Sequence, residues 1–346
     1  MNRLLWVLGA LALALVALLV APLGRQSSAR AEATGPRVGI VFDIGGRGDK
    51  SFNDGAWNGA ERASRDLGAA VRFVEPGDGS DREAGLRLLA AEHSDLVVGV
   101  GFMFTDDLMT LANEYPDVRF AGVDLAVRTD DAGNPLPLPR NLAALKFREE
   151  EGSFLVGALA ALVGGSKKVG FVGGMDIPLI HKFEQGYRQG VAAVCADCEV
   201  IAAYAGATPE AFRNPGKGKE LGLSQYEAGV NVIFHASGST GLGVFEAARA
   251  TGKLAIGVDA DQYGEAPGHV LTSMTKGVDA AVYDTTLRVK NGTFEGGIHS
   301  FGLAEGGVGY VYDEHNKDLI PEAAHARVEE LRQAIIDGRI RVKVTL

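Results

Sequence analysis

Short apolar runs alternate with amphipathic segments along nearly the whole chain beyond residue 35. Each run has the length of a buried strand, and the segments between runs carry apolar residues at the 3.6-residue spacing of a helix. This alternation is typical of β-α units around parallel sheets. Strands are predicted over 38–43, 71–74, 96–101, 119–123, 142–147, 168–172, 200–203, 232–235, 254–258 and 270–274.

Helices are predicted between most of these strands, over 53–67, 82–92, 149–163, 181–195, 218–229, 241–251, 279–291 and 321–337. Ten strands are many for a single open sheet, and the 346 residues suffice for about two domains. We therefore predict an α/β fold of two doubly wound parallel-sheet lobes. Ligands of such sheets bind beyond the carboxyl ends of the strands, so two facing lobes would form a cleft there.

The first 31 residues have the features of a secretory signal. An uncharged stretch from Leu4 to Leu23 follows Arg3 and leads to Ala29-Arg30-Ala31. This order predicts export and cleavage after Ala31, which leaves a periplasmic protein. The apolar run of about 20 residues is also long enough to span a bilayer, so a retained anchor that carries a sensory ectodomain is the alternative.

Charge excludes one large class of function. The chain has 34 Lys and Arg against 44 Asp and Glu, a net charge of −10, and it contains no basic run. Binding to nucleic acid is therefore not expected. The seven histidines form no HExxH or i, i+4 pair, so no metal or other cofactor is predicted. Cys195 and Cys198 lie at the end of a predicted helix, which favours a local disulfide over a redox site.

Three predicted strands lead directly from apolar residues into an aspartate, at Asp43, Asp124 and Asp259. A single aspartate after a strand is usually a turn residue or a helix cap. Three of them at the ligand edge of two sheets indicate a shared site instead. An ionised carboxylate can accept both hydroxyl hydrogens of a vicinal diol such as a ribose. We therefore expect these carboxylates to line the cleft.

The glycine-rich loop at 43–53 matches neither GxGxxG nor GxxxxGK[ST], and its aspartate would repel a phosphate, so no phosphate site is expected. Phe52 stands at the first turn of the next helix, either at the rim of the cleft or as a hydrophobic staple. Ser51 and Asp54 predict a start of this helix that resembles a capping box. A second loop, around Gly238, offers free backbone N–H groups at another helix start.

Seven longer segments occur in the order known from one protein family: DIGGRGDKSFNDGAWNG (43–59), FREEEGSFLVGALAA (147–161), VGFVGGMDIPLI (169–180), NPGKGKE (214–220), STGLGVFEAA (239–248), AIGVDADQ (255–262) and VLTSMTKGVD (270–279). From about Arg37 to Asp337 the chain resembles the basic membrane protein family of bacterial substrate-binding lipoproteins, and within it the purine nucleoside receptor branch. The resemblance implies a non-catalytic type I periplasmic binding protein. Its expected partners are a small-molecule nucleoside and an ABC permease, and a monomer is expected.

The resemblance also implies a set of site residues. The purine would lie between the rings of Phe52 and Phe212. The strand-end aspartates Asp43, Asp124 and Asp259 would bind ribose hydroxyls or the edge of the base. Ser51 and Asn53 would assist them. Gly238 would offer its backbone, and Lys276 would form a hydrogen bond near the sugar. After the signal segment 1–31, the N-terminal lobe is expected at 36–147 plus 275–295 and the C-terminal lobe at 148–274 plus 296–346. Three crossovers would join the two lobes.

Two departures from the family pattern affect these expectations. No cysteine precedes Cys195, so the acylated cysteine of the family's lipoproteins is missing, which favours a free periplasmic protein. The segment 207–211 resembles an insertion, which would move Phe212 away from the base if the loop points elsewhere. Another flat hydroxylated solute, such as a flavin, is the alternative ligand. An exported nucleoside hydrolase is the alternative activity, although the sequence offers it no evident general acid or metal.

Overall fold

Two six-stranded sheets organise the chain in the computed structural model, which describes residues 34–77 and 81–345. The predicted signal segment 1–31 lies outside the described residues. The chain from Gly35 onward forms one compact unit. Of the helices in the described ranges, none combines the length and the apolar character that a bilayer crossing requires.

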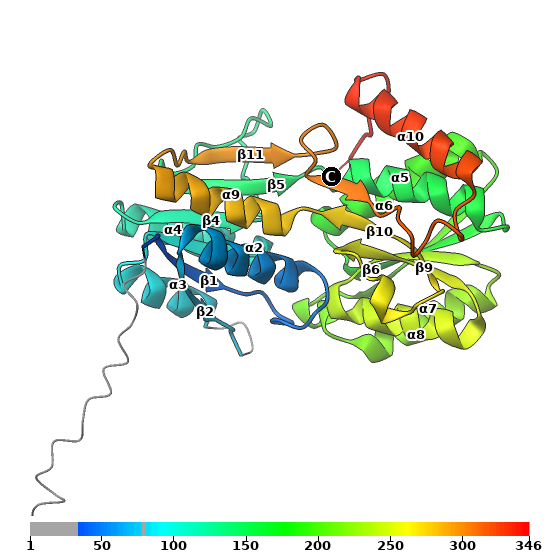
Figure 1. Ribbon diagram of the computed structural model, residues 1–346, viewed down its shortest axis with the longest axis horizontal. Coiled ribbons are helices and arrows are strands. Elements are labelled where there is room, and N and C mark those ends of the chain that lie inside the picture. The colour runs from blue at the N-terminus through cyan, green and yellow to red at the C-terminus, as the bar shows by residue number, and fades with distance from the viewer. Residues whose placement is uncertain (1–33, 78–80, 346) are drawn as a thin grey trace, which may run out of the picture. The chain divides into compact units, whose positions relative to one another are not determined.

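The first sheet has the strand order β11-β5-β4-β3-β1-β2, and all of its neighbouring strands are parallel. Its central strands are continuous apolar runs because helices cover both faces of the sheet. Helices α2 and α9 pack together on one face, and α3 and α4 cover the other (Figure 1). The elements of this first lobe are β1 (Arg37–Val41), α2 (Phe52–Leu67), β2 (Ala70–Val74), α3 (Arg82–Ala91), β3 (Leu96–Val100), α4 (Thr105–Glu114), β4 (Arg119–Val123), β5 (Leu142–Phe147), α9 (Val278–Asn291) and β11 (Gly297–Phe301).

The second sheet repeats this arrangement with the order β12-β10-β9-β8-β6-β7, and only the pair of β10 and β12 is antiparallel. Helices α5 and α6 pack on one face, and α7 and α8 pack on the other. The elements of this second lobe are α5 (Glu149–Val163), β6 (Lys168–Met175), α6 (Pro178–Val194), β7 (Glu199–Gly206), α7 (Pro215–Glu227), β8 (Val232–Ala236), α8 (Gly241–Thr251), β9 (Leu254–Asp259), β10 (Val270–Lys276), β12 (Val308–Tyr310) and α10 (Glu322–Ile336).

The chain passes between the sheets three times: from β5 to α5, from β10 to α9, and from β11 to β12. Figure 1 shows these passages side by side at the boundary between the lobes. The predicted fold, two doubly wound lobes joined by three crossovers, is confirmed. The disulfide between Cys195 and Cys198 is also present, just after α6.

Three elements were not predicted. Helix α4 buries Leu108, Leu111 and Ala112 at helical spacing, but with ten residues it gives a weak periodic signal. Strand β11 is half exposed at the edge of its sheet and has no apolar run, and β12 has only three residues. Strand β11 pairs with β5 in the first sheet, so Gly297–Phe301 belongs to the first lobe. The expected boundaries had assigned these residues to the second lobe.

Candidate ligand-binding cleft

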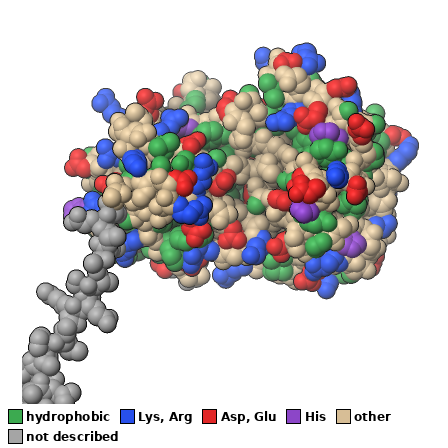
Figure 2. All heavy atoms as spheres, viewed as in Figure 1, with side chains coloured by type: hydrophobic (Ala, Val, Ile, Leu, Met, Phe, Trp, Pro, Cys, Tyr) green, Lys and Arg blue, Asp and Glu red, His purple; other side chains and the backbone are tan. Residues whose placement is uncertain are grey.

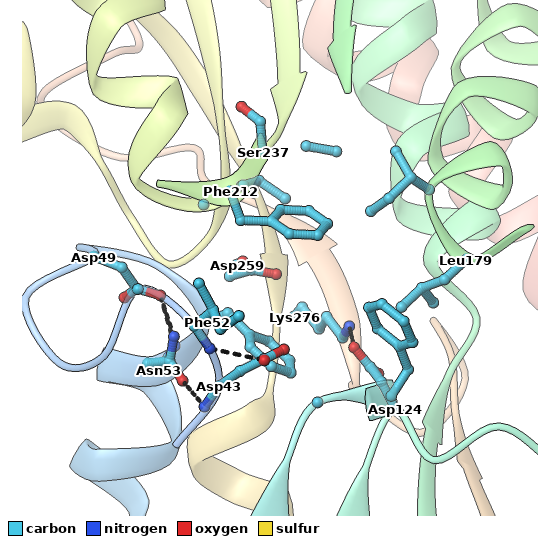
Figure 3. A pocket seen from close by; sticks show the side chains of 18 of the residues that line it. Asp43, Asp49, Phe52, Asn53, Asp124, Leu179, Phe212, Ser237, Asp259 and Lys276 are labelled. Carbon is cyan, nitrogen blue, oxygen red and sulfur yellow. Dashed lines mark hydrogen bonds and ion pairs between the residues drawn. The ribbon is translucent and has the colours of Figure 1, made fainter. Parts of the chain in front are cut away.

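A cavity lies between the two lobes at the carboxyl ends of their central strands (Figure 3). Nine site residues were predicted, and the structure brings eight of them to the lining of this cavity: Asp43, Phe52, Asn53, Asp124, Phe212, Gly238, Asp259 and Lys276. Ser51 is the exception, because it is fully buried behind the lining. The prediction that strand-end aspartates meet at one edge therefore agrees with the geometry.

Two phenylalanines approach the cavity from different lobes. Phe52 is the first residue of α2, and Phe212 ends a short 3₁₀ turn, Pro209–Phe212, between β7 and α7. Figure 3 shows Phe212 on one wall and Phe52 across the cavity from it. Of the two interpretations of Phe52, the cleft position is therefore the one that the structure supports. These two rings, among the four phenylalanines that line the cavity, give a flat ligand an aromatic surface from each lobe.

The Phe212 ring is held in place by its neighbours in the second lobe. A Cβ atom on Gly174 would lie 2.2 Å from Cε1 of Phe212, so only glycine leaves room for the ring there. Ser239 Oγ donates a hydrogen bond of 3.0 Å to the carbonyl of Phe212, and Gly238 accommodates this approach with a φ of 55°. The segment 207–211 therefore does not move Phe212 out of the cavity.

The aspartates at two equivalent strand ends have strained backbones. Asp124 directly follows β4 and Asp259 ends β9, and their φ angles are 59° and 66°. Residues other than glycine rarely adopt this left-handed region, and such strain concentrates at functional sites. In both lobes the strained conformation turns a carboxylate into the cavity (Figure 3).

Asp43 occupies the corresponding position after β1. Its Oδ1 accepts a hydrogen bond of 2.7 Å from the Ile44 N–H. A Cβ on Gly101 would come within 2.3 Å of Oδ2, so glycine at that position makes room for the carboxylate. Burial raises the pKa of Asp43 to about 6, although this hydrogen bond and the nearby Arg82 oppose the shift. The same cause, burial, raises the pKa of Asp259 to about 6.

The start of α2 differs from the predicted capping box. Asp49, which was not predicted, accepts hydrogen bonds from the backbone N–H groups of Ser51 at 2.9 Å, Asn53 at 2.9 Å and Asp54 at 3.1 Å. Asp54 instead binds backbone N–H groups within the preceding loop. The hydroxyl of Ser51 is thus free to donate to Asp259 Oδ2, at 2.5 Å, in the other lobe. Ser51 supports the cavity from behind and does not cap the helix.

Asn53 links this helix start to the first strand end. Its Nδ2 donates to Asp49 Oδ2 at 3.1 Å, and its Oδ1 accepts from the backbone N–H of Asp43 at 3.1 Å. The two bonds fix the amide next to the Asp43 carboxylate (Figure 3). Asp49 is the first residue of a DxSxN pattern that ends at Asn53. A search for capping side chains upstream of Ser51 could have found it.

Lys276 ends β10 and is the one cationic side chain among the residues that line the cavity. Its Nζ lies 2.6 Å from Asp124 Oδ2 and 3.1 Å from Glu149 Oε1, and 5.0 Å from the centroid of the Phe52 ring. Burial disfavours the ammonium group, but Asp124, Glu149 and Asp259 outweigh this and raise the pKa of Lys276 above its usual range. Lys276 therefore stays charged.

The pairing with Lys276 leaves one acceptor of Asp124 unused. Asp124 Oδ1 is buried and has no hydrogen-bond partner among the residues that the structure describes. A buried carboxylate oxygen without a donor is unfavourable by about 1–3 kcal/mol or more. A hydroxyl or N–H group brought by a ligand would supply the missing donor.

Glu149, the first residue of α5, was not predicted as a site residue because the sequence predicts a helix at that position and not a strand end. It pairs with both Lys276 and Lys182. Burial opposes its ionisation, but the two ammonium groups outweigh burial and lower the pKa of Glu149. Glu149 itself does not line the cavity, and apart from Asp49 the unpredicted residues that do are mostly apolar, among them Phe102, Leu179, Ile180 and Phe183.

A metal centre finds no support in residues 34–77 and 81–345. There, the one group of potential ligands with suitable spacing is Cys195, Asp197 and Cys198, and the disulfide occupies both sulfur atoms. The cavity is instead suited to a flat polar molecule with several hydroxyl groups. Its carboxylates accept hydrogen bonds, and they outnumber the single lysine.

Comparisons with known proteins give matches over nearly all of the described chain. The model of a family described as "ABC transporter substrate-binding protein PnrA-like" matches residues 37–345. Basic membrane protein A of Borreliella burgdorferi is 32% identical over 311 residues, which cover 89% of this chain and 87% of the relative. An uncharacterized lipoprotein of Pyrococcus abyssi is 35% identical over 324 residues, which cover 90% of this chain and 77% of the relative.

Solved structures are similar over the same range. An ABC transporter solute-binding protein from Aeropyrum pernix is 33% identical with a TM-score of 0.79, and the match covers 90% of this chain and 94% of the other. A dimeric Lac repressor, 13% identical with a TM-score of 0.55 over 81% of this chain and 98% of its own, shares the fold alone.

Proposed function

Because the chain belongs to the family of PnrA-like ABC transporter substrate-binding proteins, we propose that it captures purine nucleosides in the cavity between its lobes. Proteins of this family are solute-binding components of ABC transporters and not enzymes, and relatives named lipoprotein or basic membrane protein support a role outside the cytoplasm. The observation that carries the proposal is the pair Phe52 and Phe212. The two rings come from different lobes and border one cavity that also contains hydrogen-bond acceptors.

The rings suit a purine. Stacking of a base on an aromatic side chain is worth roughly 1–3 kcal/mol, so two rings contribute about 2–6 kcal/mol. A submicromolar Kd requires more than about 8 kcal/mol. The difference has to come from the polar groups around the sugar and the edge of the base.

The carboxylates suit a ribose. Asp43, Asp124 and Asp259 can each accept hydroxyl hydrogens, and Asp124 Oδ1 is buried without a partner among the described residues. Hydrogen bonds to charged groups contribute about 1.5–3 kcal/mol each. Lys276 lies beside Asp124 and can donate to the same part of the ligand. Asn53, anchored by Asp49, and the backbone at Gly238 complete the proposed contacts.

The excess of negative charge predicts selectivity against nucleotides. Asp43, Asp49, Asp124 and Asp259 line the cavity together with one lysine. A phosphate would bring further negative charge into a buried acidic site, and such an unpaired like charge is strongly unfavourable. We therefore expect nucleosides to bind and their monophosphates to be rejected.

Calorimetric titration of the purified protein with inosine, adenosine and guanosine tests the proposal. We expect saturable heat with a Kd below about 1 µM for at least one of them, and none with inosine 5′-monophosphate. The absence of saturable heat with all three nucleosides would contradict it. Riboflavin is included in the titration because a flat flavin could use the same rings, and a yellow purified protein would favour that ligand.

A second part of the proposal concerns the compartment in which the protein captures its ligand. We propose that residues 1–31 direct export and are removed, and that the protein then works as a free monomer that delivers its ligand to an ABC permease. The Pyrococcus abyssi relative is named a lipoprotein, whereas this chain has no cysteine before Cys195 that could carry a lipid. Mass spectrometry of the mature N-terminus tests this part: a first residue at position 32 supports it, and an intact Met1 contradicts it.

A further inference from the structure

Gln262 joins two parts of the molecule through a single side chain. It follows β9, is 2% exposed and does not line the cavity. Its Oε1 accepts from the backbone N–H of Val258 at 2.8 Å and lies 3.1 Å from Nε2 of His235. Its Nε2 donates to the carbonyl of Lys50 at 2.9 Å. Its own backbone N–H donates to Ser273 Oγ at 3.0 Å.

The orientation of this amide follows from its partners. The Val258 N–H can only donate, so the atom that faces it has to be the amide oxygen. The amide nitrogen then faces the Lys50 carbonyl, which can only accept. His235 lies at the same oxygen, so its Nε2 carries the hydrogen. Burial lowers the pKa of His235 to about 4, which keeps the ring neutral. A reversed amide would break the contacts to Val258 and Lys50 at once.

The bond from Gln262 to Lys50 crosses between the lobes. Lys50 lies in the loop between β1 and α2 of the first lobe, whereas Gln262 lies beyond β9 of the second. Lys50 has a φ of 57°, so the loop adopts a strained conformation at this contact. The next residue, Ser51, makes the parallel bond to Asp259. Both bonds connect protein atoms directly, and neither requires a ligand atom.

We propose that Gln262 is a positioning residue that holds the two lobes together at the cavity and thereby sets the affinity for the ligand. A ligand that binds the closed arrangement has an apparent Kd equal to its intrinsic Kd divided by the closed fraction. The Gln262 bridge, defined as the bond from Gln262 Nε2 to the Lys50 carbonyl, raises that fraction. Only the part of this inference that concerns affinity depends on the proposed nucleoside function.

Two substitutions separate the bridge from general stability. Gln262→Ala removes the bridge, and Gln262→Glu keeps the acceptor for Val258 but turns a second oxygen toward the Lys50 carbonyl. Gln225→Ala is the matched control: Gln225 is equally buried, at 4% exposure, and donates to the carbonyl of Phe171 within the second lobe. All three variants lose a buried glutamine contact, but only those at position 262 lose one between the lobes.

The first measurement uses the protein without ligand. Small-angle X-ray scattering gives the radius of gyration, and spin labels on Glu61→Cys and Glu227→Cys, both exposed and in different lobes, give the distance between the lobes. We expect both position-262 variants to have a larger radius and a broader, longer distance distribution, and Gln225→Ala to match the wild type. Position-262 variants that superimpose on the wild type, or an equal expansion of the control, would overturn the proposal.

The second measurement is the kinetics of inosine binding. Loss of one interlobe hydrogen bond reduces the ratio of closed to open molecules by about tenfold or less. We expect the dissociation rate constant of Gln262→Ala to rise by up to that factor, without a fall in the association rate constant. Unchanged dissociation would count against the bridge. If the wild type binds no nucleoside, the proposed function fails, and the ligand-free measurement still decides whether the bridge exists.

Discussion

The hydroxyl of Ser51 lies 2.5 Å from Asp259 Oδ2, although the two residues belong to different lobes and are 208 positions apart in the chain. Asp259 also lines the cavity, so one carboxylate faces both the opposite lobe and the ligand site. Closure of the lobes therefore completes the surroundings of this carboxylate. In such an arrangement a ligand that prefers the closed state shifts the equilibrium between open and closed lobes toward closure.

The first prediction concerns Ser51→Ala. The change removes the donor to Asp259, and the net value of such a bond is about 0.5–1.5 kcal/mol. We expect the affinity for inosine to fall roughly 2- to 10-fold, measured by calorimetry. Ser224→Ala, at an exposed position on α7, is the control. Equal affinities of the two variants would show that the Ser51 hydroxyl does not support the site.

The second prediction concerns the two rings. Phe52→Ala and Phe212→Ala should each weaken inosine binding by about 1–3 kcal/mol, because each removes one stacking surface. Phe73→Ala is a suitable control because Phe73 is 40% exposed on β2 and does not line the cavity. A loss confined to one ring would mean that the base stacks on one side only, and a loss at neither ring would contradict the sandwich.

The third prediction uses a glycine to move Phe212 without removing it. In Gly174→Ala the new Cβ would lie 2.2 Å from Cε1 of the ring, so the ring has to leave its position. We expect a loss of inosine affinity similar to that of Phe212→Ala. Gly264→Ala adds a methyl group where no atom lies within 4 Å, and it should bind normally. Wild-type affinity in Gly174→Ala would show that the position of the Phe212 ring is unimportant.

The sequence could predict a site residue where a local pattern, such as the end of a strand, determines the position of that residue. Asp43, Asp124 and Asp259 could be found because a parallel strand places the residue after its carboxyl end at the ligand edge. Phe212 has no such local pattern, and Lys276, which ends β10, lies beyond the strand predicted over 270–274, so only the resemblance to the family pointed to them. The bond from Gln262 to Lys50 joins residues 212 positions apart. Such a contact depends on how the lobes pack, which no local pattern encodes.

The capping of α2 illustrates a second limit. The pattern Ser51-x-x-Asp54 favours a capping box, yet Asp49 takes the backbone N–H groups, and the Ser51 hydroxyl turns to the other lobe. Asp49 alone satisfies three backbone N–H groups at the start of the helix, so the Ser51 hydroxyl is not needed there. The bond to Asp259, which exists only in the folded protein, favours this arrangement over the capping box.

The fourth prediction concerns pH and Asp43. Burial raises its pKa from 3.8 to about 6, so the folded state binds a proton more tightly than the unfolded state does. The resulting contribution to stability is fully present below about pH 4 and is lost as the pH rises through about 6. Asp43→Asn should therefore raise the free energy of unfolding at pH 7 by about 1–3 kcal/mol, with little change at pH 4.

Urea denaturation at both pH values measures this difference. Asp284→Asn, at an exposed position on α9, should change stability by less than about 0.5 kcal/mol at either pH. The Asp43 variant should also bind inosine more weakly although it is more stable, as expected where a functional group is held at a cost to folding. A variant that is no more stable at pH 7 than the wild type would contradict the raised pKa.

The fifth prediction concerns Lys276, whose side chain is 2% exposed and whose ammonium group contacts both Asp124 and Glu149. Lys276→Met keeps the length of the side chain but leaves two buried carboxylates with less compensation. Removal of one partner from a buried ion pair costs about 3–5 kcal/mol. Lys219→Met breaks an ion pair with Glu246 in which both side chains are 46% exposed, and such pairs contribute about 0–1 kcal/mol. Urea denaturation should therefore separate the two variants by at least about 2 kcal/mol. Equal losses would mean that water reaches the carboxylates around Lys276, and the cavity would then be too wet for the hydrogen bonds that the proposed binding requires.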